Sequence, residues 1–174
     1  ASVTRKVITV PVVALSPTMQ PVEAAEPASS KPIRATTGPM AAGGKTTLIR
    51  DLIRQISDGN EYVKGCSVGV VDERSEIAGC SGGIPGNDVG IRTDVLDACP
   101  KAKGLMMLIR SMAPEVVAAD EIGSQEDLEA FTYAMRCGCV LFATVHGSSF
   151  RELLEKPVLK DLVRERLFSR YIFL

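Results

Sequence analysis

GPMAAGGKTTLIRD, residues 38–51, contains the Gly-Lys-Thr triplet that closes a phosphate-binding loop, at residues 44–46. The full motif, G-x-x-x-x-G-K-[ST], joins a strand to a helix whose N-terminal N–H groups surround phosphate oxygens. Its first glycine should stand where this chain has Pro39, and Gly38 comes one residue too early. The stretch therefore predicts a P-loop between a strand and a helix, with an intact lysine end and an altered start.

The overall composition is that of a soluble globular domain. The chain has 174 residues, of which 45% are hydrophobic and 24% charged, enough for about one domain with a sizeable core. The formal charge of −1 gives no general attraction for nucleic acid. Aromatic residues make up only 5% of the chain and tryptophan is absent, so no base-stacking platform is expected. We expect no nucleic-acid partner.

The cysteines indicate the compartment. Five cysteines, without a C-x-x-C pair and with a single histidine, argue against a zinc site. An odd number of cysteines and the lack of a signal peptide fit a reducing cytoplasm. No apolar run reaches the 18 or more residues of a membrane span. We expect a cytoplasmic chain with no membrane span of its own.

The chain divides near residue 36 into a proline-rich segment and a domain. In residues 1–36, a strand is predicted from residue 7 to residue 15, and Pro11 should confine it to a sheet edge. Residues 20–32 are typical of a flexible linker. The domain is predicted over residues 37–174.

Within residues 37–174, strands alternate with helices, which predicts a mostly parallel sheet with helices on both faces. Apolar residues at a spacing of three and four indicate a first helix, which Gly59 should end. Helices are predicted at residues 45–56, 101–112, 125–137 and 150–167, the last one broken at Pro157. Strands are predicted at residues 67–72, 115–120, 139–146 and 170–174.

The acidic pair in EVVAADEIG, residues 115–123, follows an apolar strand. In P-loop ATPases an aspartate at this place holds Mg²⁺, often through water, and a glutamate polarises the attacking water. These are the roles predicted for Asp120 and Glu121. Lys45 would reach the β- and γ-phosphates and the Thr46 hydroxyl would ligate Mg²⁺, so ATP and Mg²⁺ are the expected cofactors. The alternatives are a surface acidic pair and a glycine-rich helix start with a solvated lysine.

Two further stretches end predicted strands at the same edge of the sheet, where open α/β sheets bind ligands. In VDERSEIAG, residues 71–79, the charged residues are Asp72, Glu73, Arg74 and Glu76. In ATVHG, residues 143–147, His146 is placed to contact a γ-phosphate and report its loss. The alternatives are a solvated charged loop and a structural histidine.

Five stretches together resemble one family. They are GKTTLIRDLIRQIS, VGVVDERSEIAG, DVGIRTDVLDACPKAKGLMMLIRSMAPEVVAADEIG, ATVHG and RYIFL, from about residue 44 to the end. They are similar to the stage III sporulation protein AA family of endospore-forming bacteria. The resemblance implies a RecA-like P-loop ATPase core related to type II and type IV secretion ATPases. It also implies a hexameric ring that energises membrane-embedded channel proteins between mother cell and forespore, peripheral to the membrane on the mother-cell side.

The resemblance assigns roles to individual residues. The P-loop end that binds the nucleotide is assigned to Gly43, Gly44, Lys45, Thr46 and Thr47. The Mg²⁺ and water roles fall on Asp120 and Glu121, the acidic box of the secretion ATPases on Asp72, Glu73 and Arg74, and their histidine box on His146. Arg92 and Arg110 are both candidates for an arginine finger that reaches a neighbour's γ-phosphate. The sequence does not choose between them, and both are equally compatible with ordinary ion pairs.

The chain departs from the family at its start. The family's N-terminal region is not found in residues 1–36, and the strand before the loop, PIRATT, is poorly apolar. A non-glycine residue forced into a left-handed conformation at Ala42 would cost about 1–2 kcal/mol, or roughly tenfold in affinity. Two functions follow as alternatives. One is an ATPase, and the other is an interaction protein, impaired in nucleotide binding, that keeps the fold and docks to a ring or channel.

Overall fold

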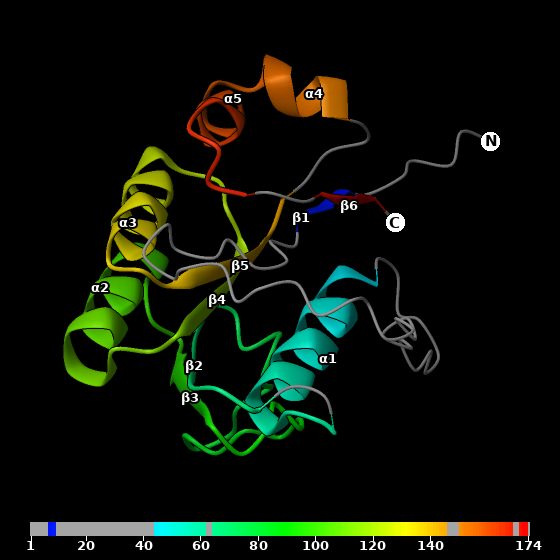
Figure 1. Cartoon of the computed structure of the whole chain (residues 1–174), viewed down its shortest axis with the longest axis vertical. Coiled ribbons are helices and arrows are strands. Elements are labelled where there is room, and N and C mark those ends of the chain that lie inside the picture. The colour runs from blue at the N-terminus through cyan, green and yellow to red at the C-terminus, as the bar shows by residue number, and fades with distance from the viewer. Residues whose placement is uncertain (1–6, 10–43, 62–63, 146–149, 169–170, 174) are drawn as a thin grey trace, which may run out of the picture.

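The computed structural model describes residues 7–9, 44–61, 64–145, 150–168 and 171–173. Within these residues one sheet has the strand order β3-β2-β4-β5-β1-β6 (Figure 1). Its strands are β1 (Val7–Thr9), β2 (Val68–Asp72), β3 (Thr93–Asp97), β4 (Val116–Glu121), β5 (Val140–Thr144) and β6 (Ile172–Phe173). The helices are α1 (Lys45–Asp58), α2 (Lys101–Met112), α3 (Gln125–Arg136), α4 (Phe150–Glu155) and α5 (Pro157–Arg164).

The centre of the sheet is parallel. Strand β2 pairs in parallel with β3 and with β4, and β4 pairs in parallel with β5. Every residue of β2 is buried, as are the first five of β4. Parallel sheets are covered on both faces, so their strands are near-continuous apolar runs, as in SVGVVD and EVVAAD. The predicted mostly parallel α/β fold is therefore confirmed.

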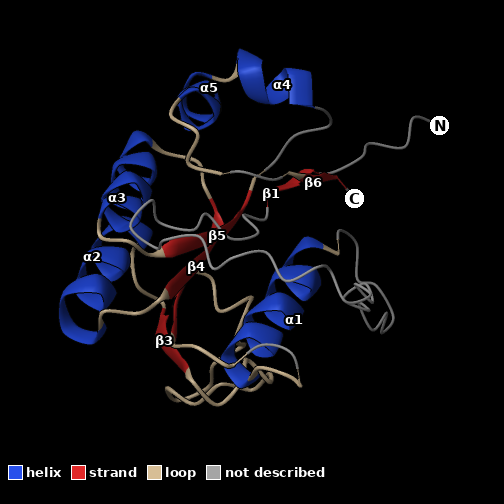
Figure 2. Cartoon of the chain, viewed as in Figure 1, coloured by secondary structure: helices blue, strands red, loops and turns tan. Residues whose placement is uncertain are grey.

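Side chains alternate between the two faces of the sheet along each central strand, so the domain has two apolar cores, one on each face. Val68 and Val70 of β2 pack in one cluster with Ile49, Leu52 and Ile53 of α1. Strand residues that point to the other face, such as Val71, pack in the other cluster with α2 and α3. Because successive strand side chains point to opposite faces, α1 covers one face and α2 and α3 cover the other, as Figure 2 shows. The predicted three layers are confirmed.

The observed elements follow the predicted ones closely in the domain. Helix α2 has the predicted bounds, α1 runs two residues further, to Asp58, and Gly59 ends it with a φ of 75°. Pro157 is the first residue of α5, so the predicted helix over 150–167 is two helices separated at Lys156. Strand β5 ends at Thr144. The strand expected at 170–174 is β6, described over Ile172–Phe173.

Two strands differ from the sequence-based expectation. Strand β3 was not predicted, because its TDVLD sequence has polar residues at three of five positions and no position in it is fully buried. Strand β1 was predicted at an edge, which is wrong: Val7–Thr9 lie between β5 and β6 and pair antiparallel with both. Residue 11, which motivated the edge position, lies outside the described residues, as do the linker and the strand expected to lead into the P-loop.

Helix α2 lies unusually close to β2 because of one glycine. A Cβ built on Gly104 would stand 2.6 Å from Cγ1 and 3.0 Å from Cγ2 of Val71. Real Cβ atoms do not approach neighbours that closely. Gly104 therefore fixes the distance between the helix and the sheet, and with it the place of the α2 N-terminus. None of the described helices has the length and apolar character needed to cross a membrane.

We expect Gly104→Ala to lower the free energy of unfolding by about 1–3 kcal/mol, because the added methyl overpacks the contact with Val71. Elsewhere in a helix this change raises stability by up to about 1 kcal/mol. Urea unfolding of Gly104→Ala, Val71→Ala and the double variant measures the coupling. The double variant should lose less than the sum of the two single changes. Additive losses would show that the close contact does not limit stability.

Candidate functional site

The candidate site lies where the parallel strands end. Asp72 is the last residue of β2, Glu121 of β4 and Thr144 of β5. Helix α2 begins soon after β3, α3 soon after β4, and the side chain at the start of α1 reaches the end of β5. Carboxyl ends of parallel strands meet at one edge, which is where ligands bind in open α/β sheets.

The start of α1 is tied to this edge by Lys45. Gly44, immediately before the helix, has a left-handed backbone (φ 59°) and gives the helix no side-chain cap. Lys45 is 8% exposed, and its Nζ donates a long hydrogen bond of 3.5 Å to the carbonyl oxygen of Val145. Thr46 is half-buried and Thr47 is exposed. The helix thus presents N–H groups without a side-chain cap next to a buried cation, an arrangement suited to an anion.

The ends of β4 and β5 are joined to each other. The Ile122 N–H donates to the Thr144 carbonyl at 2.9 Å, and Glu121 is in register with Thr144. The register shifts between Ala119 and Glu121, which leaves Asp120 as the additional residue of an irregularity in the strand. Such bulges re-aim side chains. The Asp120–Glu121 pair therefore ends the strand next to β5, and Lys45 contacts the residue that follows β5.

A residue that sequence reasoning missed lies at the centre of the site. Lys101, the first residue of α2, has its Nζ 2.8 Å from Asp120 Oδ1 and 3.2 Å from Glu73 Oε2. The same ammonium donates a 2.7 Å hydrogen bond to the Glu121 carbonyl oxygen. Its side chain is 8% exposed and that of Asp120 is 9% exposed. The only sequence signal was a lysine placed directly after Pro100, at a helix start where basic residues are disfavoured.

Burial and pairing act in opposite directions on these groups. Burial raises the pKa of Asp120 above its ordinary value, and the Lys101 ammonium opposes that rise. Burial lowers the pKa of Lys101, but its close contacts with the negative charges of Asp120 and Glu73 outweigh burial, so the Lys101 pKa is raised. The ammonium therefore keeps its charge inside the protein.

The other charged residues of the edge are more exposed. Arg74 Nη1 lies 3.9 Å from Glu121 Oε2, and the Arg74 side chain is 61% exposed, so this pair contributes little to stability. A polar cavity of about 370 Å³ is lined by Glu73, Arg74, Lys101, Glu121 and the first residues of α2 and α3. Ser124 caps α3 by accepting from the Asp127 N–H. The cavity therefore reaches Lys101, the ion-pair partner of buried Asp120.

Asp72 has a different surrounding from its neighbours Glu73 and Arg74. It is fully buried, and its Oδ1 accepts a hydrogen bond from the Glu76 N–H at 2.9 Å. Its Oδ2 accepts from the N–H groups of Ile77 and Ala78, at 3.0 and 2.8 Å. Both oxygens are thus occupied by the loop that follows β2. The geometry gives Asp72 the task of holding this loop, while Glu73 and Arg74 face the cavity.

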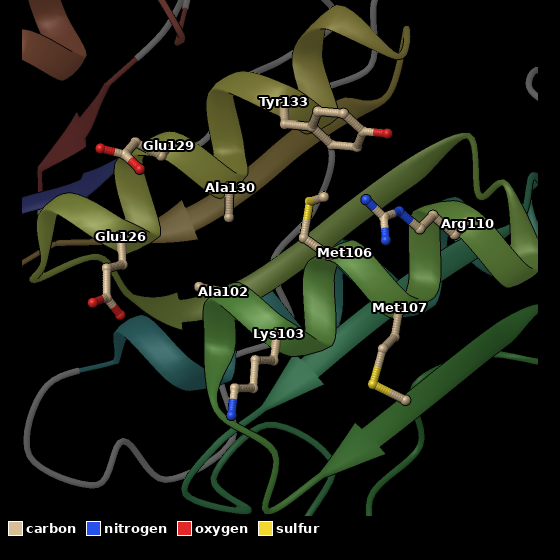
Figure 3. A pocket seen from close by; sticks show the side chains of 9 residues that line it. All are labelled: Ala102, Lys103, Met106, Met107, Arg110, Glu126, Glu129, Ala130 and Tyr133. Atoms are coloured by element: carbon tan, nitrogen blue, oxygen red, sulfur yellow. The ribbon is translucent and has the colours of Figure 1, made fainter.

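The two candidate arginine fingers lie near the far ends of α1 and α2: Arg92 in the turn before β3, against the end of α1, and Arg110 in the last turn of α2. Arg92 Nη1 donates to the carbonyl oxygens of Ser57 and Asp58, at the end of α1, at 2.9 and 3.4 Å. Arg110 lies in the last turn of α2 and lines an open groove of about 650 Å³ between α2 and α3 (Figure 3). At about 1.5 Å per residue, the lengths of α1 and α2 place these two helix ends more than about 13 Å from the site. Within one chain neither arginine is brought to Asp120. Gly43 and His146 lie outside the described residues.

The fold and this edge define an α/β protein with a parallel central sheet and a site at the carboxyl ends of its strands. The family model described as "Sporulation stage III, protein AA" matches residues 30–174, and the chain belongs to that family. The sequence-based identification of the family is therefore confirmed.

Curated relatives lie in bacteria and in plastid-bearing organisms. The chain is 54% identical to the stage III sporulation protein AA of Bacillus subtilis, over 74% of this chain and 42% of that protein. It is 37% identical to the protein ycf45 of Porphyra purpurea, over 69% of this chain and 21% of that one. It is 35% identical to the protein SEEDLING PLASTID DEVELOPMENT 1 of Arabidopsis thaliana, over 69% and 17%. The chain thus spans less than half the length of these relatives.

Among solved structures, the chain is similar to the ATPase DotB of Legionella pneumophila. The TM-score is 0.49 at 20% sequence identity, over 66% of this chain and 31% of DotB.

We expect Asp72→Asn to lower the free energy of unfolding by about 2–4 kcal/mol, because an amide group turned toward backbone N–H donors leaves them unpaired. Urea unfolding measures the loss. Asp94→Asn is the matched control, since Asp94 is exposed on β3 and should change stability by less than about 0.5 kcal/mol. Equal stability of the two variants would contradict the loop-holding role of Asp72.

Proposed function

We propose that this chain is the ATP-binding domain of a Mg²⁺-dependent ATPase that energises or gates a secretion-like channel assembly in sporulation. One observation carries the proposal. The Gly44–Lys45–Thr46 helix start and the Asp120–Glu121 strand end lie at one sheet edge, joined through the Val145 and Thr144 carbonyls. A phosphate site and a metal-binding carboxylate must be this close for phosphoryl transfer.

The residues present fit ATP and Mg²⁺. Asp120 Oδ1 is buried, and among the described residues it accepts no hydrogen bond of good geometry, only the ion pair with Lys101. Such an oxygen is suited to a hard cation, and Mg²⁺ needs only one or two protein carboxylates because it keeps waters and phosphate ligands. Mg²⁺ would supply neutralisation of charge on the phosphates. Lys45 and the α1 N–H groups would bind phosphate, and the Thr46 hydroxyl would complete the metal ligands.

Glu121 follows Asp120 directly and borders the polar cavity, so it is placed to orient and polarise a water molecule. The ring of six subunits, the membrane-embedded channel partners, the cytoplasmic location and the trans-acting arginine belong to the proposal through family membership. Since Arg92 and Arg110 both lie far from their own chain's site, only a neighbouring subunit could use either of them.

The alternative is an interaction protein that keeps the fold without turnover. The occupation of Asp120 by Lys101 and the proline near the start of the loop favour it. The two functions differ in nucleotide binding, which is measured directly.

We expect the purified chain to bind a fluorescent ATP analogue with Mg²⁺, and Lys45→Ala to weaken binding by about 10- to 100-fold, because one charge-assisted hydrogen bond to phosphate is lost. Lys160→Ala, at an exposed position of α5, is the control and should bind as the parent does. If the folded parent binds no nucleotide, the ATPase proposal is wrong and the interaction protein is the supported function.

Glu121→Gln should keep ATP binding and lower turnover by at least about 100-fold, since the amide cannot polarise water. Phosphate release at saturating ATP, measured for parent and variant at equal protein concentration, checks this. Glu129→Gln on the exposed face of α3 is the control for the same chemical change. Equal turnover in Glu121→Gln and parent would remove the role assigned to Glu121.

A further inference from the structure

Lys101 is a buried charge that the proposed ATPase mechanism does not use. Its ammonium donates a hydrogen bond to the Glu121 carbonyl oxygen and forms ion pairs with the carboxylates of Asp120 and Glu73, so three acceptor groups surround it. The geometry is therefore that of a specific cation site rather than of a lysine that only packs its aliphatic chain.

Local structure does not explain this position. Lys101 is the first residue of α2, where the helix dipole repels a positive charge and where no acidic residue stands in the first turn. Burial also disfavours the charge. The ammonium is held there by tertiary contacts, chiefly by the carboxylate of Asp120 at 2.8 Å. Departures from local preference are expected at functional or strained positions.

The ammonium occupies the oxygen that Mg²⁺ would need. Oδ1 of Asp120 is buried and has the Lys101 ion pair but no well-formed hydrogen bond from the described residues. A Mg²⁺ ion at this oxygen and the ammonium would repel each other by several kcal/mol at about 4 Å in a partly buried site. The lysine and the metal therefore compete for Oδ1.

We propose that Lys101 is a resident counter-cation at Asp120, which Mg²⁺ displaces when it binds that carboxylate, and that Glu73 then receives the released ammonium. This rests on the proposed role of Asp120 as a Mg²⁺ ligand. Glu73 Oε2 is already 3.2 Å from the ammonium, and its side chain is 42% exposed at the polar cavity. The lysine can thus leave Oδ1 without losing a carboxylate partner.

The exchange couples metal binding to the loop after β2. Glu73 follows Asp72, whose carboxylate holds the backbone of residues 76–78. With Lys101 on Asp120, that buried carboxylate has a cation beside it and is protected from adventitious cations. When Mg²⁺ is bound to Asp120, the Lys101 ammonium pairs with Glu73 and so links Glu73 to α2. Lys101 therefore acts as a positioning residue that sets the Mg²⁺ concentration at which the site fills.

The test uses Mg²⁺ alone, without nucleotide, and thermal unfolding of the full chain. Lys101→Met removes the charge and keeps the length of the side chain. In EDTA its Tm should fall by roughly 6–20 °C, because Asp120 is left buried without a cation. Mg²⁺ should restore more of the Tm than it adds to the parent, with a half-effect at a concentration at least about tenfold lower. Lys103→Met, exposed on the same helix, should respond to Mg²⁺ as the parent does.

A double variant tests whether Asp120 is the carboxylate that binds the metal. Lys101→Met combined with Asp120→Asn removes both charges, so its Tm should not respond to Mg²⁺ beyond the response of the parent. The proposal is overturned if Lys101→Met responds to Mg²⁺ no more than the parent. It is also overturned if the double variant keeps the gain, since the metal would then bind elsewhere.

A second measurement needs no variant and decides the matter if Lys101→Met does not fold. In the parent, acylation of lysines by an amine-reactive reagent, followed by mass spectrometry, should label buried Lys101 slowly. Saturating Mg²⁺ should raise the labelling rate of Lys101 several-fold while that of exposed Lys160 stays constant. An unchanged rate at Lys101 would overturn the exchange.

The experiments distinguish a failure of the proposed cation exchange from a failure of the proposed ATPase function. If the parent binds no nucleotide but Lys101→Met gains a Mg²⁺ response, the exchange stands and the ATPase proposal falls. If the parent binds ATP in a Mg²⁺-dependent way and Lys101→Met shows no gain over the parent, the exchange alone falls and Lys101 is a structural ion-pair residue.

Discussion

Parallel pairing of the central strands is the constraint on which the site depends. Because β2, β4 and β5 run in the same direction, their carboxyl ends at Asp72, Glu121 and Thr144 meet at one edge. Helices on both faces then bury this edge in part, since α1 covers one side and α2 and α3 the other. The pairing therefore brings acidic residues out of water, and such residues must find donors or cations inside the protein.

The protein meets that requirement in two different ways. Asp72 is balanced by backbone N–H groups of its own loop, a local solution that fixes the loop. Asp120 is balanced by Lys101, which comes from another helix. Backbone donors cannot leave, whereas a lysine on a flexible stem can exchange with a metal ion. The two buried carboxylates therefore differ in what they can do, although each ends or nearly ends an apolar strand.

How far the site could be predicted depends on how local each residue's contacts are. Lys45, Asp120 and Glu121 were recognised because their motifs are short and the edge rule places strand ends together. Lys101 was missed because its partners stand 19 to 28 residues away in the sequence, and no spacing rule links them. The finger candidates Arg92 and Arg110 looked equivalent in sequence. The structure shows that both lie beyond the reach of their own site, since helix length separates them from it.

The sequence by itself determined the helices of the domain and all its strands except β3. Apolar periodicity, Gly59 and Pro157 predicted the helix bounds to within three residues, because these signals act through adjacent turns of the chain. Only the tertiary structure decided what lies beside what. Strand β3 exists through its pairing with β2, and β1 lies between β5 and β6 rather than at an edge. The packing of α2 on the sheet likewise places the Lys101 ammonium at Asp120. Contacts between distant segments depend on the whole fold, and no periodic pattern in the sequence indicates them.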